Sequence, residues 1–326
     1  MPVKNAGAYL HDCLSSIRGQ TFSFWELIVV NDHSTDNSLK ILEQHAAEDP
    51  RIRRFQNPGQ GIIPALQCAL ANTRGTYITR MDGDDLMPEN RLELMYRAIE
   101  NQPDKTIITG KVRYFSNTEV SEGYQKYEQW LNERVTQNDH WSWIYRECVI
   151  ASPNWMVRKK DLLAMKAFEQ LSYPEDYDLV LKWYRHGFEV HCLNELTLHW
   201  REHPARTSRN SEHYDQAHFF RLKLRHFLEQ EIRADESLVL WGVNPKGRVT
   251  AQILQSYDQA FTWMDLHPDQ YPDGVRGQSI LPFQAIETIS GYKLLIAVYP
   301  PEKERRKLEV YLQGLGLQMG QDYWYL

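Results

Sequence analysis

Two short apolar segments that each end in acidic residues place the strongest constraint on the fold of this chain. Residues 26–30 form a β-branched run that stops at Asp32, and residues 76–81 form a second run that stops at Asp82. Segments with helical spacing lie around these runs, at 6–18, 37–47 and 62–73. Strands that alternate with helices predict an α/β fold with a mostly parallel sheet. In such sheets ligands lie at the carboxyl ends of the strands, which is where both acidic clusters fall.

The second acidic cluster, Asp82-Gly83-Asp84-Asp85, brings several carboxylates to one place. Residues two apart on a strand point to the same side, so Asp82 and Asp84 can aim at a single point. Their repulsion has to be offset by a cation or by several hydrogen-bond donors. A divalent ion bound by one or two carboxylates and by phosphate oxygens is one solution. A solvated acidic turn is the alternative, because Asp is common in turns.

The composition is that of an ordinary globular protein and excludes several classes. The 326 residues suffice for two domains, and 42% hydrophobic with 25% charged residues is a usual balance. A net charge of −6 offers no basic surface for nucleic acid. We find no membrane span and no signal-type run at the start. Four scattered cysteines predict neither a disulfide framework nor a zinc site, and they fit a reducing cytoplasm.

The chain beyond the acidic cluster continues the α/β pattern and then changes character. The elements expected there are strands at 107–115 and 148–157 and a helix at 176–187. Residues 211–231 form a charged helix, which we expect to be part of a connector between two domains. Its mixed charges make a place on a membrane surface the less favoured interpretation. We therefore divide the chain into a first domain at 1–210, a helical connector at 211–234 and a second domain at 235–326.

The second domain has the pattern of a small Rossmann-like α/β unit. Its expected strands are 238–241, 260–264 and 293–299, with helices after the first strand and at 302–314. The turn from Gly242 to Gly247 follows the first strand but lacks the second glycine of a dinucleotide fingerprint. Asp265 stands where a ribose-binding acid would. A docking or structural role is favoured over nucleotide binding.

Three further motifs can carry chemistry, and each also has a structural interpretation. Asp32 can accept a hydrogen bond from a nucleobase or belong to a helix-capping turn. Glu175 and Asp176 open a helix, where acids are common. Arg201 and His203 suit a phosphate or a metal, although a lone histidine is more often structural. None of these motifs is decisive alone.

Together the motifs, in this order and at these separations, resemble glycosyltransferase family 2, whose members are inverting nucleotide-sugar transferases of the GT-A fold. Residues 1–10 and the block from Ser16 to Asp32 resemble the opening of that family. The acidic cluster, the Glu175-Asp176 pair and the later Arg201-Glu202-His203 loop continue the resemblance, which covers about residues 1–210. It implies a GT-A domain there, with the Rossmann-like domain appended.

The resemblance also implies a role for each matched residue. The residues that it assigns to the nucleotide sugar are Pro2, Val3, Asp32, Asp82 and Arg201. Asp84 and His203 would bind Mn²⁺ or Mg²⁺, with Asp82 shared between metal and ribose. Asp176 would be the general base that takes the proton of the acceptor hydroxyl, and Glu175 would position the base or the acceptor.

Some positions depart from the family pattern. The apolar residues that normally precede the Met-Pro-Val segment are missing, so we expect a missing or truncated first strand. Lys4 and Asn31 replace more common residues, and the helix start near Gln60 is altered. These changes affect positions at which the family pattern places the nucleotide pocket.

The expected function is a metal-dependent transfer of a sugar from a nucleotide diphosphate, with UDP favoured, to a hydroxyl of a glycan or lipid-linked acceptor, in surface polysaccharide synthesis. Asn154 and Trp155, with the aromatic Trp130, Trp141 and Trp143, are the expected acceptor contacts, and plain packing is the alternative. A sugar-phosphate nucleotidyltransferase is less favoured because residues 1–10 lack its glycine-rich loop. A degenerate, non-catalytic binding or scaffold protein is the other alternative. We expect a cytoplasmic protein, at most peripheral to a membrane.

Overall fold

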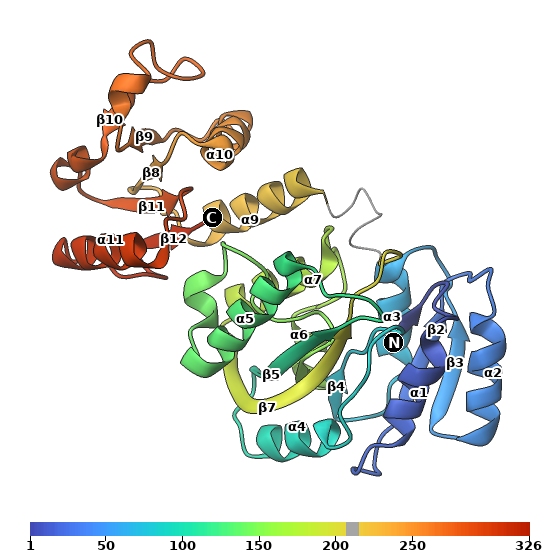
Figure 1. Ribbon diagram of the computed structural model, residues 1–326. Coiled ribbons are helices and arrows are strands. Elements are labelled where there is room, and N and C mark those ends of the chain that lie inside the picture. Colours follow the sequence, from blue (N-terminus) through green and yellow to red (C-terminus); the bar gives the residue numbers. More distant parts are fainter. Residues whose placement is uncertain (207–214) are drawn as a thin grey trace. The chain divides into compact units, whose positions relative to one another are not determined.

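The protein is represented by a computed structural model that describes residues 1–206 and 215–326 (Figure 1). The chain divides into two compact units, one made of residues 1–140 with 149–210 and the other of 141–148 with 211–326. The segment 141–148 therefore belongs to the second unit, which the sequence did not indicate. The predicted boundary after residue 210 lies outside the described residues.

The first unit begins with a parallel sheet. Its strands follow the order β1 (Pro2–Val3), β2 (Leu27–Asn31) and β3 (Ile52–Gln56). Every residue of β2 is buried, in agreement with its apolar, β-branched sequence. The helices of this part are α1 (Leu10–Arg18), α2 (Ser38–Glu48) and α3 (Ile62–Asn72). Helix α3 packs on β2, and α2 packs on β3 (Figure 1).

The second sheet of this unit is mixed. Its order is β4 (Tyr77–Thr79), β6 (Met156–Arg158), β5 (Thr106–Phe115) and β7 (Glu189–Arg201). Strand β6 is antiparallel to both neighbours, whereas β5 and β7 run parallel along a long ladder (Figure 1). The remaining helices are α4 (Arg91–Glu100), α5 (Glu122–Gln137), α6 (Lys159–Ala164) and α7 (Glu175–Arg185). The expected helix at 176–187 is confirmed.

One predicted strand of this unit is mostly wrong. Residues 148–155 are not a strand, and only Met156–Arg158 pair in the sheet. Pro153 has no N–H to give to a ladder. The N–H of Asn154 bonds to the carbonyl of Ala151 at 2.8 Å, which closes a turn instead.

The second unit is a five-stranded parallel sheet flanked by helices. The strand order is β10 (Ile280–Pro282), β9 (Thr262–Asp265), β8 (Ser237–Trp241), β11 (Tyr292–Ile296) and β12 (Tyr323–Tyr325). Its helices are α9 (Gln216–Gln230), α10 (Pro245–Ser256) and α11 (Glu302–Gly314). The predicted Rossmann-like pattern is present. Asp265 accepts the N–H groups of Val243 and His267, so this carboxylate braces its own loop.

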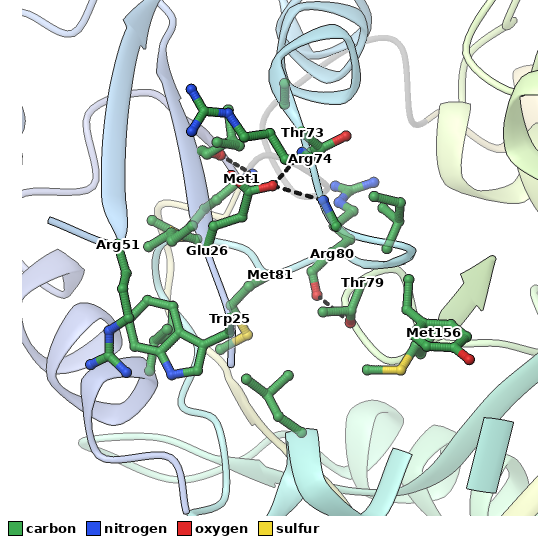
Figure 2. Close-up of a pocket in the computed structure, with 18 of the residues that line it drawn as sticks. Met1, Trp25, Glu26, Arg51, Thr73, Arg74, Thr79, Arg80, Met81 and Met156 are labelled. Carbon is green, nitrogen blue, oxygen red and sulfur yellow. Dashed lines mark hydrogen bonds between the residues drawn. The ribbon is translucent and has the colours of Figure 1, made fainter. Parts of the chain in front are cut away.

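A cavity of about 1080 Å³ lies between β2 and β4 in the first unit (Figure 2). Strand β1 consists of Pro2 and Val3 alone and begins beside this space. The amino group of Met1 is buried there and donates to the carbonyl of Ile28 at 2.8 Å, and burial lowers its pKa to about 5. The side chains of Met81 and Met156 point into the cavity. The cavity separates the start of β2 from β4, which is an edge strand of the other sheet of this unit.

An apolar strand of about five residues, joined to the amino group of Met1, should stabilise the first unit. It would extend β1 along β2, cover the edge of β4 and replace a buried amine with a peptide bond. One buried Val or Ile contributes roughly 1.5–3 kcal/mol. We expect the free energy of unfolding, measured by urea denaturation, to rise by at least about 2 kcal/mol. An extension of equal length with alternating Asp and Pro is the control, and equal stability of the two proteins would contradict the expectation.

Candidate active site

The acidic cluster after β4 meets the start of α7 through one arginine. The Nε atom of Arg80 donates to Asp82 at 2.9 Å, and one terminal nitrogen of the same guanidinium donates to Glu175 at 3.1 Å. Arg80 is 6% exposed and Glu175 is 1% exposed, so the bridge is buried. Residues 95 positions apart along the chain are thereby joined at one place.

A second connection joins the acidic cluster to the end of β7. Leu86 and His199 exchange two main-chain hydrogen bonds of 3.0 Å. This bridge brings the residues that follow β7 beside the acids. The Nε2 atom of His203 lies 2.9 Å from a carboxylate oxygen of Asp84. Arg201 donates its side-chain Nε–H to the main-chain carbonyl of Asp84 at 2.7 Å.

Burial raises the pKa of two carboxyl groups of the site, Asp176 and Asp82. Burial, and next the charge of Glu175, raises the pKa of Asp176 to about 7, although Arg80 opposes this. Burial also raises the pKa of Asp82, again against the effect of Arg80. Asp176 is half-buried, so its carboxyl stays open to a reactant. A carboxyl that titrates near neutral pH is suited to take a proton from a hydroxyl.

Asp32 lies at the end of β2, as the sequence predicted, and is almost fully buried. One of its oxygens accepts hydrogen bonds from the side chain of Asn57 at 2.6 Å and from the N–H of Gly61 at 3.0 Å. Lys4 lies 3.4 Å from its other oxygen. Val3 contributes its carbonyl to the N–H of Asp32 at 2.7 Å, so the β1 main chain is next to this carboxylate. A nucleobase that bound to Asp32 would replace hydrogen bonds that this carboxylate already makes within the protein.

The residues near Asp84 fit a hard divalent ion. A carboxylate and an imidazole face each other there, and the Nδ1 atom of His203 is buried without a hydrogen-bond partner in the described part of the chain. Carboxylate and imidazole are ligands that Mn²⁺ accepts, whereas Mg²⁺ relies on carboxylates and phosphate oxygens. Within residues 1–206 and 215–326 no group of three or more His, Cys, Asp or Glu side chains is preassembled. A metal would thus need oxygens from a bound diphosphate.

The residues predicted to contact an acceptor are mostly in packed interiors. Asn154 is fully buried and gives its amide to the carbonyl of Gly110 at 2.7 Å, and Trp155 packs edge-on against Trp183. Their burial favours packing over acceptor binding. Trp130 stacks on Tyr127. Trp141 and Trp143 belong to the second unit, where Trp143 stacks on Tyr325.

Sequence reasoning missed two residues that shape the site. Arg80 was treated as part of a buried strand, although a single charged residue in an apolar run that ends in acids is itself a signal. Asn57, which holds Asp32, follows β3, a strand that the sequence pattern did not predict.

Among the described residues no helix combines the length and the apolar character that crossing a bilayer requires.

Residues 1–164, half of the chain, match the family described as Glycosyl transferase family 2. The chain belongs to this family. Glycosyltransferase GlyG of Streptococcus pneumoniae is 27% identical over 204 residues, which cover 60% of this chain and 67% of GlyG. Chondroitin synthase of Escherichia coli is 35% identical over 94 residues, 29% of this chain but only 14% of that enzyme. The family membership argues against the sugar-phosphate nucleotidyltransferase alternative.

Solved structures show the same fold. The TarS 1–349 fragment from S. aureus in complex with UDP-GlcNAc gives a TM-score of 0.56 at 18% identity, over 78% of this chain and 70% of that one. The mannosyltransferase PcManGT of Pyrobaculum calidifontis, in complex with GDP-Man and Mn2+, gives a TM-score of 0.54 at 17% identity, over 79% of this chain and 73% of that one. The predicted GT-A fold is confirmed.

If Asp176 is the base, activity must follow the ionised form of its carboxyl. Because a base works only when deprotonated, kcat should rise with pH through about 7 and then level off, and fall tenfold per pH unit well below it. Asp176→Asn should lower kcat by roughly 10²–10⁴-fold with little change in donor affinity. The exposed Asp104→Asn is the control. A large loss of donor affinity in Asp176→Asn would assign this residue to donor binding instead.

Proposed function

We propose that this protein is a metal-dependent, inverting glycosyltransferase that moves a hexose from a nucleoside diphosphate to a hydroxyl of a glycan or lipid-linked acceptor. The observation that carries the proposal is the convergence of two separate acidic motifs on one buried guanidinium, with Asp84 against His203 beside them. This arrangement supplies a donor side and a base side close to each other in the first unit.

The residues of the first unit divide the work between the two substrates. Asp32, with the main chain of Pro2 and Val3, holds the base of the nucleotide, and Asp82 holds its ribose. Arg201 and His203 face the diphosphate, where Asp84 and His203 would hold the ion together with phosphate oxygens. A bound Mn²⁺ or Mg²⁺ supplies positive charge that stabilises the leaving diphosphate.

The acceptor side is the start of α7. Asp176 takes the proton of the attacking hydroxyl as the new bond to the anomeric carbon forms, and Glu175 keeps this carboxylate in place. Attack from the face opposite the leaving group inverts the anomeric configuration. Glu175 is buried against Arg80, whereas Asp176 beside it is half-buried, so the base remains within reach of the acceptor hydroxyl.

The comparisons guide the choice of substrates. UDP-GlcNAc and GDP-Man occupy the structures of similar fold, and GlyG and chondroitin synthase are the named relatives, so UDP-sugars come first and polysaccharide synthesis is the proposed setting. The chain spans about two thirds of GlyG and much less of chondroitin synthase. We place the reaction in the cytoplasm, where a lipid-linked acceptor would require contact with a membrane surface.

Thermal unfolding with a panel of nucleotides and nucleotide sugars, with and without Mn²⁺, tests the proposal. We expect a UDP or GDP compound to raise Tm only with the metal, because the diphosphate completes the metal's ligand shell. A ligand at a hundredfold its Kd stabilises by about 2.7 kcal/mol. Asp84→Ala should abolish the metal-dependent part, whereas the exposed Asp104→Ala should retain it.

The absence of nucleotide binding would contradict the proposal. If no nucleotide raises Tm with either Mn²⁺ or Mg²⁺, the chain is not an active donor-binding enzyme, and a scaffold role replaces the transferase. For an active protein, the anomeric configuration of the product, read by NMR, decides between inversion and retention.

A further inference from the structure

Arg80 has not been given a role in the reaction, yet it makes the most central contacts of the site. Its guanidinium binds two partners through different edges. On one edge, Nε donates to one carboxylate oxygen of Asp82 at 2.9 Å, and a terminal nitrogen lies 3.4 Å from the other oxygen of Asp82. The second terminal nitrogen donates to Glu175 at 3.1 Å. Asp82 belongs to the donor side and Glu175 to the acceptor side of the proposed site. A single planar group thus spans both.

We propose that Arg80 is a positioning residue that fixes the donor-binding Asp82 and the acceptor-side Glu175 relative to each other, so that the donor and the base are aligned through one guanidinium. The inference rests on the proposed function, because it assigns the two carboxylates to donor and acceptor. Arg80 acts through these carboxylates and does not touch the reacting atoms.

The geometry requires arginine at this position. A guanidinium presents several N–H donors in a fixed plane, so it can hold two carboxylates at a set angle, whereas the ammonium of lysine is a point charge on a flexible stem. The positive charge also offsets the repulsion among Asp82, Glu175 and Asp176, all of which lie near it. Without that charge the two motifs would move apart or take up protons.

Arg91 and the partly buried Arg158 show what a purely structural role looks like in this chain. Arg91 is fully buried and donates to the carbonyls of Arg80 and Pro153 and to the hydroxyl of Thr79. Arg158 donates to the carbonyls of Ile99, Gln102 and Pro103. Both guanidiniums bond mainly to main-chain oxygens, whereas Arg80 bonds to two side-chain carboxylates of the site. What distinguishes Arg80 is that its two carboxylate partners come from separate motifs of the proposed site.

The test compares Arg80→Lys, Arg80→Ala and the control Arg158→Ala in the full chain. The affinity for UDP with Mn²⁺, from calorimetry, reports on the donor side, and release of UDP from UDP-GlcNAc reports on turnover. GDP and GDP-mannose replace these probes if UDP does not bind. Partners that orient ligand-binding groups typically affect affinity or activity by 10–100-fold. We expect losses of roughly that size in both quantities for Arg80→Ala, smaller ones for Arg80→Lys, and none for Arg158→Ala even if its Tm falls.

Chemical rescue distinguishes alignment from stability. Millimolar guanidinium should restore part of the turnover of Arg80→Ala, because the free ion can occupy the space between the two carboxylates. Unchanged nucleotide affinity and turnover in Arg80→Ala, with only a lower Tm, would overturn the inference while leaving the proposed function intact. If Arg80→Ala does not fold, Arg80→Lys decides by the same two measurements. Failure of the parent protein to bind any nucleotide would overturn the proposed function and the inference together.

Discussion

Burial of several carboxylates at one point is the constraint on which the first unit depends. Two like charges about 4 Å apart repel by roughly 4 kcal/mol near a protein surface, and Asp82, Glu175 and Asp176 share such a region. Arg80 offsets this repulsion with two ion pairs, both largely shielded from water. Removing one partner of a buried pair typically costs about 3–5 kcal/mol. Arg80 therefore lowers the electrostatic cost of bringing the two acidic motifs together.

The pairing of β5 with β7 in the mixed sheet explains how the end of β7 reaches the acidic cluster. Strands β5 and β7 run parallel over a long ladder, so β7 delivers Arg201 to the edge where the acidic cluster lies. The two bonds between Leu86 and His199 then fix the loop after β4 to β7. His203 meets Asp84 as a consequence of this register. The positions of Arg201 and His203 beside the acidic cluster thus follow from main-chain pairing.

The parts that could be predicted from the sequence are those with local signals. Strand β2, helix α7 and the acids at their ends follow from apolar runs and from helix-start residues. Strand β7 could not be predicted because its burial alternates irregularly and its partner lies about eighty residues earlier in the chain. Arg80 was missed because the role of an arginine in an apolar run depends on its partners, and one of them, Glu175, lies 95 positions further along the chain. Asn154 and Trp155 show the opposite error. These polar and aromatic residues suggested a ligand surface, but both are buried in the core, where Asn154 donates to the carbonyl of Gly110.

The third acid of the cluster shows how one short motif serves both fold and chemistry. Asp85 is 1% exposed and accepts the N–H of Arg201 at 2.8 Å, so it ties the acidic loop to the end of β7. Its burial, and next the charge of Asp84, raises its pKa well above the usual range. The charges of Asp84 and Asp82 contribute to this shift, so the neighbouring carboxylates disfavour a negative charge on Asp85. The third acid of the motif thus makes the main-chain connection to β7, whereas Asp82 faces Arg80 and Asp84 faces His203.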